Sequence, residues 1–176
     1  MNLFDSICDN LQETFEKLGY SETEVSFNYP PKTLKTLFGN RGMSDGELAD
    51  RLCGFAHEQE GKLGRISFRK NGDVFLLTVP REGARFVHTE RKPDPFLSAL
   101  VRVTMTFFAT KEDVHRVFLD TGRPFTVRPF SEPDLDEVIF FTDRDSYCYC
   151  FSYGEERPEL HRLLPEDFAE LYAPLG

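Results

Sequence analysis

The tetrapeptide Lys70-Asn71-Gly72-Asp73 is the feature that most constrains how this chain of 176 residues folds. Asn-Gly pairs favour the tight turns that join neighbouring antiparallel strands, because both residues tolerate a positive φ. Residues 63–69 alternate between apolar and polar before this turn, and residues 74–79 are apolar on both faces after it. We therefore predict a β-hairpin whose second strand lies at the centre of a sheet.

A second hairpin is expected near the C-terminal end of the chain. Residues 137–141 and 146–153 have strand character and flank a predicted turn at 143–145. Residues 25–29 and 84–90 also alternate in polarity, so we expect one strand before the first hairpin and a third strand after it.

Helices are predicted from apolar periodicity and from start signals. Residues 3–18 carry their apolar side chains on one stripe, and Ser44 and Glu47 have the spacing of a capping box. Residues 96–108 also fit a strand pattern, but their length and the preceding Asp94-Pro95 favour a buried helix. The predicted helices span residues 3–18, 45–59, 95–109, 111–121 and 165–172.

Segregated hairpins without regular β-α-β alternation predict an α+β fold. We expect an antiparallel sheet of about five strands, built from the two hairpins, with helices packed on one face. The length suits a single globular domain over residues 1–176, and segment 123–136, a strand fragment and loop with three prolines, is the one candidate boundary between subregions. The predicted core contains Phe4, Ile7, Leu11, Leu52, Phe55, Ile66, Phe68, Phe75, Leu77, Leu100, Phe107, Phe118, Ile139 and Phe141.

The charge pattern limits the partners that this chain can have. Its net charge is −9, with a basic middle (net +6 over residues 61–128) between acidic ends. This balance argues against binding to long duplex nucleic acid. The first five residues lack the basic segment of a secretion signal, and the most apolar stretch is too short for a bilayer and contains Arg102. We therefore expect a cytoplasmic protein with no membrane association, and the sequence leaves its oligomeric state open.

The cysteines are expected to be packing residues. Cys148 and Cys150 alternate with aromatic residues, so both would lie on one face of a strand. A structural zinc site needs about four ligands, and this motif has no second cysteine pair nearby. Asp50, Cys53 and His57 share one side of a predicted helix but lack a further ligand pair. We predict no metal site and no cofactor.

The sequence contains no recognised catalytic motif. It has no Gly-x-Ser-x-Gly elbow, no phosphate-binding Gly-x-x-x-x-Gly-Lys loop and no dinucleotide-binding glycine pattern. No catalytic residue is predicted. The sequence leaves open whether the protein is an enzyme, and the absence of these motifs favours a protein without enzymatic activity. The favoured interpretation is a small acidic protein that binds another protein through charge and exposed aromatic residues, namely Tyr147, Tyr149 and Tyr153.

The alternative interpretation is a protein or hydrolase that binds a small anion. Arg65 and Arg69 share one face of the first hairpin strand, and Arg85 would join them if residues 84–90 formed a neighbouring strand. Such a cluster could hold a carboxylate or phosphate, with His88 as a nearby acid or base. A simpler interpretation is that these arginines pair with the acidic C-terminal segment.

Overall fold

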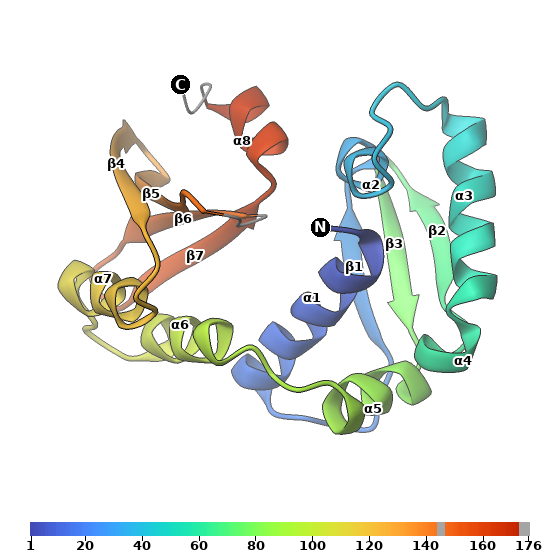
Figure 1. The fold of residues 1–176 in the computed structure, drawn as a ribbon, viewed down its shortest axis with the longest axis horizontal. Coiled ribbons are helices and arrows are strands. Elements are labelled where there is room, and N and C mark those ends of the chain that lie inside the picture. The colour runs from blue at the N-terminus through green and yellow to red at the C-terminus, as the bar shows by residue number, and fades with distance from the viewer. Residues whose placement is uncertain (144–146, 173–176) are drawn as a thin grey trace. The chain divides into compact units, whose positions relative to one another are not determined.

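The computed structural model describes residues 1–143 and 147–172 and divides the chain into two compact units, Met1–Pro93 and Asp94–Gly176 (Figure 1). Each unit contains helices and an antiparallel sheet, which confirms the α+β class. Segment 123–136 lies inside the second unit, where it contributes strands. The single domain over residues 1–176 stays a prediction.

The first unit contains a three-stranded antiparallel sheet in the order β1-β3-β2. Its strands are β1 (Val25–Tyr29), β2 (Ser67–Asn71) and β3 (Val74–Val79). Asn71 pairs with Val74 across the turn, and Gly72 takes a φ of 60°, a left-handed conformation that glycine adopts without strain. The predicted hairpin is therefore confirmed, and β3 is the central strand as expected.

The two helices expected in the first unit, over residues 3–18 and 45–59, are confirmed, and the buried side chains of the first lie on a single stripe. The helices are α1 (Leu3–Leu18), α2 (Pro31–Leu37), α3 (Asp45–Glu58), α4 (Glu60–Leu63) and α5 (Arg81–Glu90).

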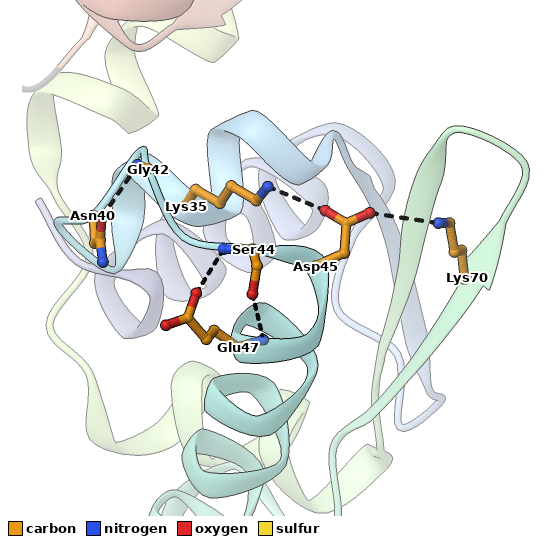
Figure 2. A network of polar contacts seen from close by, with 7 residues as sticks. All are labelled: Lys35, Asn40, Gly42, Ser44, Asp45, Glu47 and Lys70. Atoms are coloured by element: carbon orange, nitrogen blue, oxygen red, sulfur yellow. Dashed lines mark hydrogen bonds and ion pairs between the residues drawn. The ribbon is translucent and has the colours of Figure 1, made fainter.

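The start of α3 connects three segments of the first unit (Figure 2). The Ser44 hydroxyl accepts a hydrogen bond from the Glu47 amide at 3.2 Å, and the Ser44 amide donates to the Glu47 carboxylate at 2.7 Å. These two bonds form the predicted capping box. The Asp45 carboxylate also contacts Lys35 of α2 at 3.1 Å and Lys70 of β2 at 3.9 Å. The hydrogen bond from Lys35 lowers the pKa of Asp45, and both lysine charges add to this effect.

The strand predicted for residues 84–90 is wrong, because this segment belongs to α5. Pro80 stands at the N-cap, and Gly83, Ala84 and Val87 are buried at helical spacing. A Cβ atom at Gly83 would lie only 2.3 Å from the Leu63 carbonyl oxygen. Gly83 therefore lets α5 pack closely against Leu63 and Val79. The alternating polarity of residues 84–90 does not reveal this packing.

The second unit contains a four-stranded antiparallel sheet in the order β4-β5-β6-β7. Its elements are α6 (Pro95–Met105), α7 (Lys111–Asp120), β4 (Phe125–Glu132), β5 (Leu135–Phe141), β6 (Cys148–Tyr153), β7 (Pro158–Leu163) and α8 (Pro165–Leu171). The helix expected over residues 95–109 is confirmed but ends at Met105.

The predicted strand count needs correction, because the described residues form seven strands in two sheets and not about five in one. The second hairpin is confirmed as β5 and β6, and part of its predicted turn lies outside the described residues. Residues 158–163 add a strand that the sequence did not predict, because their polarity does not alternate strongly. None of the helices in the described ranges is both long and apolar enough to traverse a bilayer.

Strand β6 is buried on both faces. Cys148 and Cys150 lie in an apolar cluster with Phe168 of α8. The ring of Tyr149, on the opposite face, lies 5.4 Å from that of Phe118 in α7. Burial, together with the smaller effect of the neighbouring Cys148, raises the pKa of Cys150 to about 12. Cys150 therefore has little thiolate character, and both cysteines are small buried groups in the apolar core.

Candidate functional site

The four residues of the predicted anion site do not share one sheet face. Arg65 precedes β2, and its Nε donates to Glu60 at 2.9 Å, while Arg69 lies within β2. Arg85 and His88 lie one turn apart on α5. Because Arg85 is on a helix, the expected alignment with Arg65 and Arg69 across neighbouring strands is not formed. Anion binding by this set stays a prediction.

Two of the three tyrosines of the predicted interaction surface are buried, not exposed as expected. Tyr147 and Tyr149 are only 8% and 4% exposed, so they are not the exposed aromatic residues that the prediction required. The Arg162 guanidinium lies 4.7 Å from the centroid of the Tyr147 ring. Tyr153 is half-buried and directs its hydroxyl to Glu137. The reason is that β6 is an interior strand, covered on both faces by helices of its own unit.

Asp50, Cys53 and His57 of α3 do not form a set of metal ligands in the described part of the chain. Cys53 of α3 is exposed, and the His57 Nδ1 atom lies 4.0 Å from a Glu60 oxygen. Across residues 1–143 and 147–172, no three His, Cys, Asp or Glu side chains gather as they would around a metal ion.

A buried carboxylate marks the most unusual polar site of the second unit. Glu137 of β5 is completely buried. Its Oε1 atom accepts from the Tyr153 hydroxyl at 2.5 Å and from His115 Nε2 at 2.7 Å. Its Oε2 atom forms an ion pair with the Lys111 ammonium group. A buried charge is tolerated only when it is paired and hydrogen-bonded, and these three partners meet that condition.

The electrostatics of this cluster follow from burial and from hydrogen bonding. Burial alone raises the pKa of Glu137, but hydrogen bonds from Lys111, Tyr153 and His115 outweigh it, so the net shift is downward. Burial raises the pKa of Tyr153, and its hydrogen bond to the Glu137 carboxylate raises it further. Glu137 is therefore ionised at neutral pH, and Tyr153 stays protonated as a donor. Such a saturated carboxylate is a weak base, so the cluster is suited to holding elements together.

The secondary structure explains why these side chains meet. Lys111 and His115 are four residues apart on α7 and therefore project from the same side of the helix. Glu137 pairs with Phe151 in the β5–β6 ladder, and Tyr153 lies two residues beyond Phe151 on the same face. The cluster thus joins the first turn of α7 to the sheet.

An open cavity of about 580 Å³ lies beside this cluster. Lys111 and Tyr153 contribute to its wall, so the buried carboxylate holds two wall residues in place. Acidic groups are also present, because the Asp136 and Glu155 side chains line the cavity. The remaining lining comes from the α6–α7 and β6–β7 connections and consists of Phe108, Ala109, Thr110 and Gly154.

Two exposed phenylalanines stand on the α6–α7 connection, residues 106–110, which we call the aromatic turn. Phe107 is 63% exposed and Phe108 is 77% exposed, so the predicted core position of Phe107 is wrong. Phe108 has a φ of 61°, which is uncommon for a bulky residue. Its amide donates to the Glu156 carbonyl at 2.6 Å, and Arg157 contacts the Met105 sulfur at 3.7 Å. The β6–β7 connection therefore supports the aromatic turn.

Sequence reasoning missed both parts of this site. A signal for Glu137 was present, because it occupies the same alternating face as the apolar residues Ile139 and Phe141. An acidic residue on an otherwise apolar strand face indicates a paired buried charge. The exposure of Phe107 had no comparable signal, because apolar residues continue past the end of α6 with only Thr106 between Met105 and Phe107.

Comparison with known protein families gives a match to this chain. The family described as "Domain of unknown function, E. rectale Gene description (DUF3877)" matches residues 1–172. Neither the curated proteins nor the solved structures yield a match to the chain. Since the match covers almost the whole chain and both units, the protein belongs to the DUF3877 family.

Proposed function

We propose that this protein is a non-enzymatic interaction module whose second unit binds a basic segment of a partner protein at the aromatic turn. The observation that carries the proposal is the pair Phe107 and Phe108, exposed beside an open cavity with acidic side chains in its wall. Binding would bury both rings, while the basic groups of the partner would face the acidic side chains.

The charge distribution supports a basic partner. Residues 94–176 contain 16 acidic and 8 basic residues, so the second unit carries a net −8 of the total −9. Glu112 and Asp136 lie close enough to Tyr153 to raise its pKa by their charge, in addition to burial and Glu137. Clustered charge of one sign attracts a partner of opposite sign and speeds its association.

The aromatic turn has the properties of an interface anchor. Large aromatic side chains contribute most of the binding free energy at many interfaces, because they bury much apolar area at low entropic cost. Phe108 is held in a strained backbone conformation, and strain of this kind is often retained at sites of function. Glu137 is fully engaged by three neighbours, which supports a positioning role for the cluster beneath the turn.

The test is a binding titration with a defined peptide, followed by fluorescence anisotropy. The probe is a labelled peptide rich in Arg and Phe, compared with one carrying Glu in place of Arg and one carrying Ser in place of Phe. We expect only the first peptide to bind, and we expect its affinity to fall when salt rises from about 50 mM to about 500 mM. The variant Phe107→Ser/Phe108→Gly should weaken binding by about tenfold or more.

The matched control is Leu119→Ser, which removes another exposed apolar side chain from the second unit. It should leave the affinity within about twofold of the parent protein. Equal binding of the acidic and basic peptides would contradict the proposal, as would equal losses in the control and in the aromatic double variant.

A further inference from the structure

The first unit contains a second cavity, of about 660 Å³, between the start of α1, the end of α2 and the α3–α4 segment. Its volume lies within the range of small-molecule sites. Three phenyl rings line it, from Phe4, Phe38 and Phe55. The Phe38 and Phe55 rings are packed edge to face with centroids 6.1 Å apart, which leaves aromatic surface for an apolar guest.

Two cations lie on the aromatic walls of this cavity. The Arg51 guanidinium is 5.5 Å from the centroid of the Phe38 ring, and the Lys62 ammonium is 5.3 Å from that of Phe4. Arg51 and Lys62 both line the cavity, and both residues are exposed to solvent. A cation stacked on a ring is restrained in position, so these charges are arranged before any ligand arrives.

Gly54 opens the wall between these cations. It lies in the interior of α3, where glycine is less favourable than alanine. A Cβ atom at Gly54 would meet nothing within 4 Å, so close packing does not require glycine at this position. Because Gly54 lines the cavity, the absence of a side chain leaves space that a ligand can fill.

We propose that this cavity binds a small aromatic carboxylate. The ring of the ligand would pack against Phe4, Phe38 and Phe55, and its carboxylate would pair with Arg51 and Lys62, because a guanidinium matches carboxylate geometry. Asp50 and Glu58 also line the cavity and would repel a second negative group. The site therefore selects a single carboxylate on an aromatic body, and none of Arg65, Arg69 and Arg85 takes part.

The test uses three probes of one shape and different charge: 3-phenylpropionate, 3-phenylpropionamide and 3-phenylpropylamine. Backbone amide shifts of the intact protein are followed by NMR during each titration. We expect saturable shifts at residues 50–62 and 37–38, with the carboxylate binding about fivefold or more tightly than the amide, as one or two exposed charge interactions allow. The amine should bind most weakly.

Variants separate the roles of charge and space. Arg51→Gln/Lys62→Gln should reduce carboxylate affinity to that of the amide and leave amide binding unchanged. Gly54→Leu should abolish binding of all three probes because it fills the cavity. The matched control Arg69→Gln/Arg85→Gln removes two exposed cations of the same unit and should change nothing.

Three outcomes would overturn the proposal. The first is the absence of saturable shifts with any probe, and the second is equal affinity for all three. The third is a loss of carboxylate preference in Arg69→Gln/Arg85→Gln but not in Arg51→Gln/Lys62→Gln, which would instead assign anion binding to the arginines of the first hairpin and α5.

Discussion

At the scale of single residues, Phe108 combines high exposure with an unfavourable backbone conformation. A left-handed conformation costs a non-glycine residue about 1–2 kcal/mol, whereas glycine adopts it freely but loses more entropy on folding. We therefore expect Phe108→Gly to raise the free energy of unfolding by about 0.5–1 kcal/mol, measured by urea denaturation. The same change at Phe107, which lacks a positive φ, should not stabilise the protein. A destabilised Phe108→Gly variant would show that the ring supports the fold.

Glu137 is the residue whose charge should matter most to stability. The pKa of Glu137 is lower in the folded protein than the value of about 4.5 for the unfolded chain. The carboxylate therefore adds its full stabilisation above about pH 4.5, and this stabilisation is lost as the pH falls through the folded pKa. We expect Glu137→Gln to cost about 2–3 kcal/mol at pH 7, because charged hydrogen bonds in a buried site are lost.

The difference between Glu137→Gln and the parent protein should shrink as the pH falls below about 4.5, where the unfolded-state carboxylate becomes protonated, and it should be lost once the folded carboxylate, whose pKa is lower, is protonated too. Urea midpoints measured between about pH 3 and pH 8 provide this comparison. Glu159→Gln, at an exposed position of β7, is the control and should follow the parent protein at every pH. A gap that does not change with pH would mean that the carboxylate charge is not the stabilising feature.

At the scale of elements, substitutions at Gly83 of α5 and Gly54 of α3 test whether close packing requires a glycine at each position. A Cβ at Gly83 would lie 2.3 Å from the Leu63 carbonyl oxygen and 2.6 Å from Val79 Cγ1. We expect Gly83→Ala to cost about 2–3 kcal/mol, because neither backbone nor buried β3 can move away easily. Gly54→Ala should instead stabilise α3 by about 0.5–1 kcal/mol. Thermal unfolding measures both, and equal effects would contradict the packing argument.

At the scale of the whole molecule, the single domain predicted for residues 1–176 can be tested with variants from each unit. Gly83→Ala acts in the first unit and Glu137→Gln in the second. If the chain is one cooperative domain, calorimetry should show a single transition that both variants lower. Two transitions, each lowered by only one variant, would establish two domains joined near Pro93 and Asp94.

Local chemistry in the sequence was enough to predict many of the elements. Gly72 specified the first hairpin, since it takes the positive φ that the two-residue turn Gly72-Asp73 between Asn71 and Val74 requires. Ser44 with Glu47 specified the start of α3, because the capping bonds involve only residues within one turn. Alternation specified that Cys148 and Cys150 share one face of β6.

Tertiary structure decided the features that depend on distant residues. Residues 84–90 alternate like a strand but form part of α5, because Gly83 and Ala84 fit closely against neighbouring elements. The site at Glu137 required α7 and β6 to supply its partners, and the cavity beside Arg51 required four helical segments to converge. Turns and caps depend on neighbours in the chain and are readable from sequence, whereas burial, charge pairing and cavities depend on contacts across the fold.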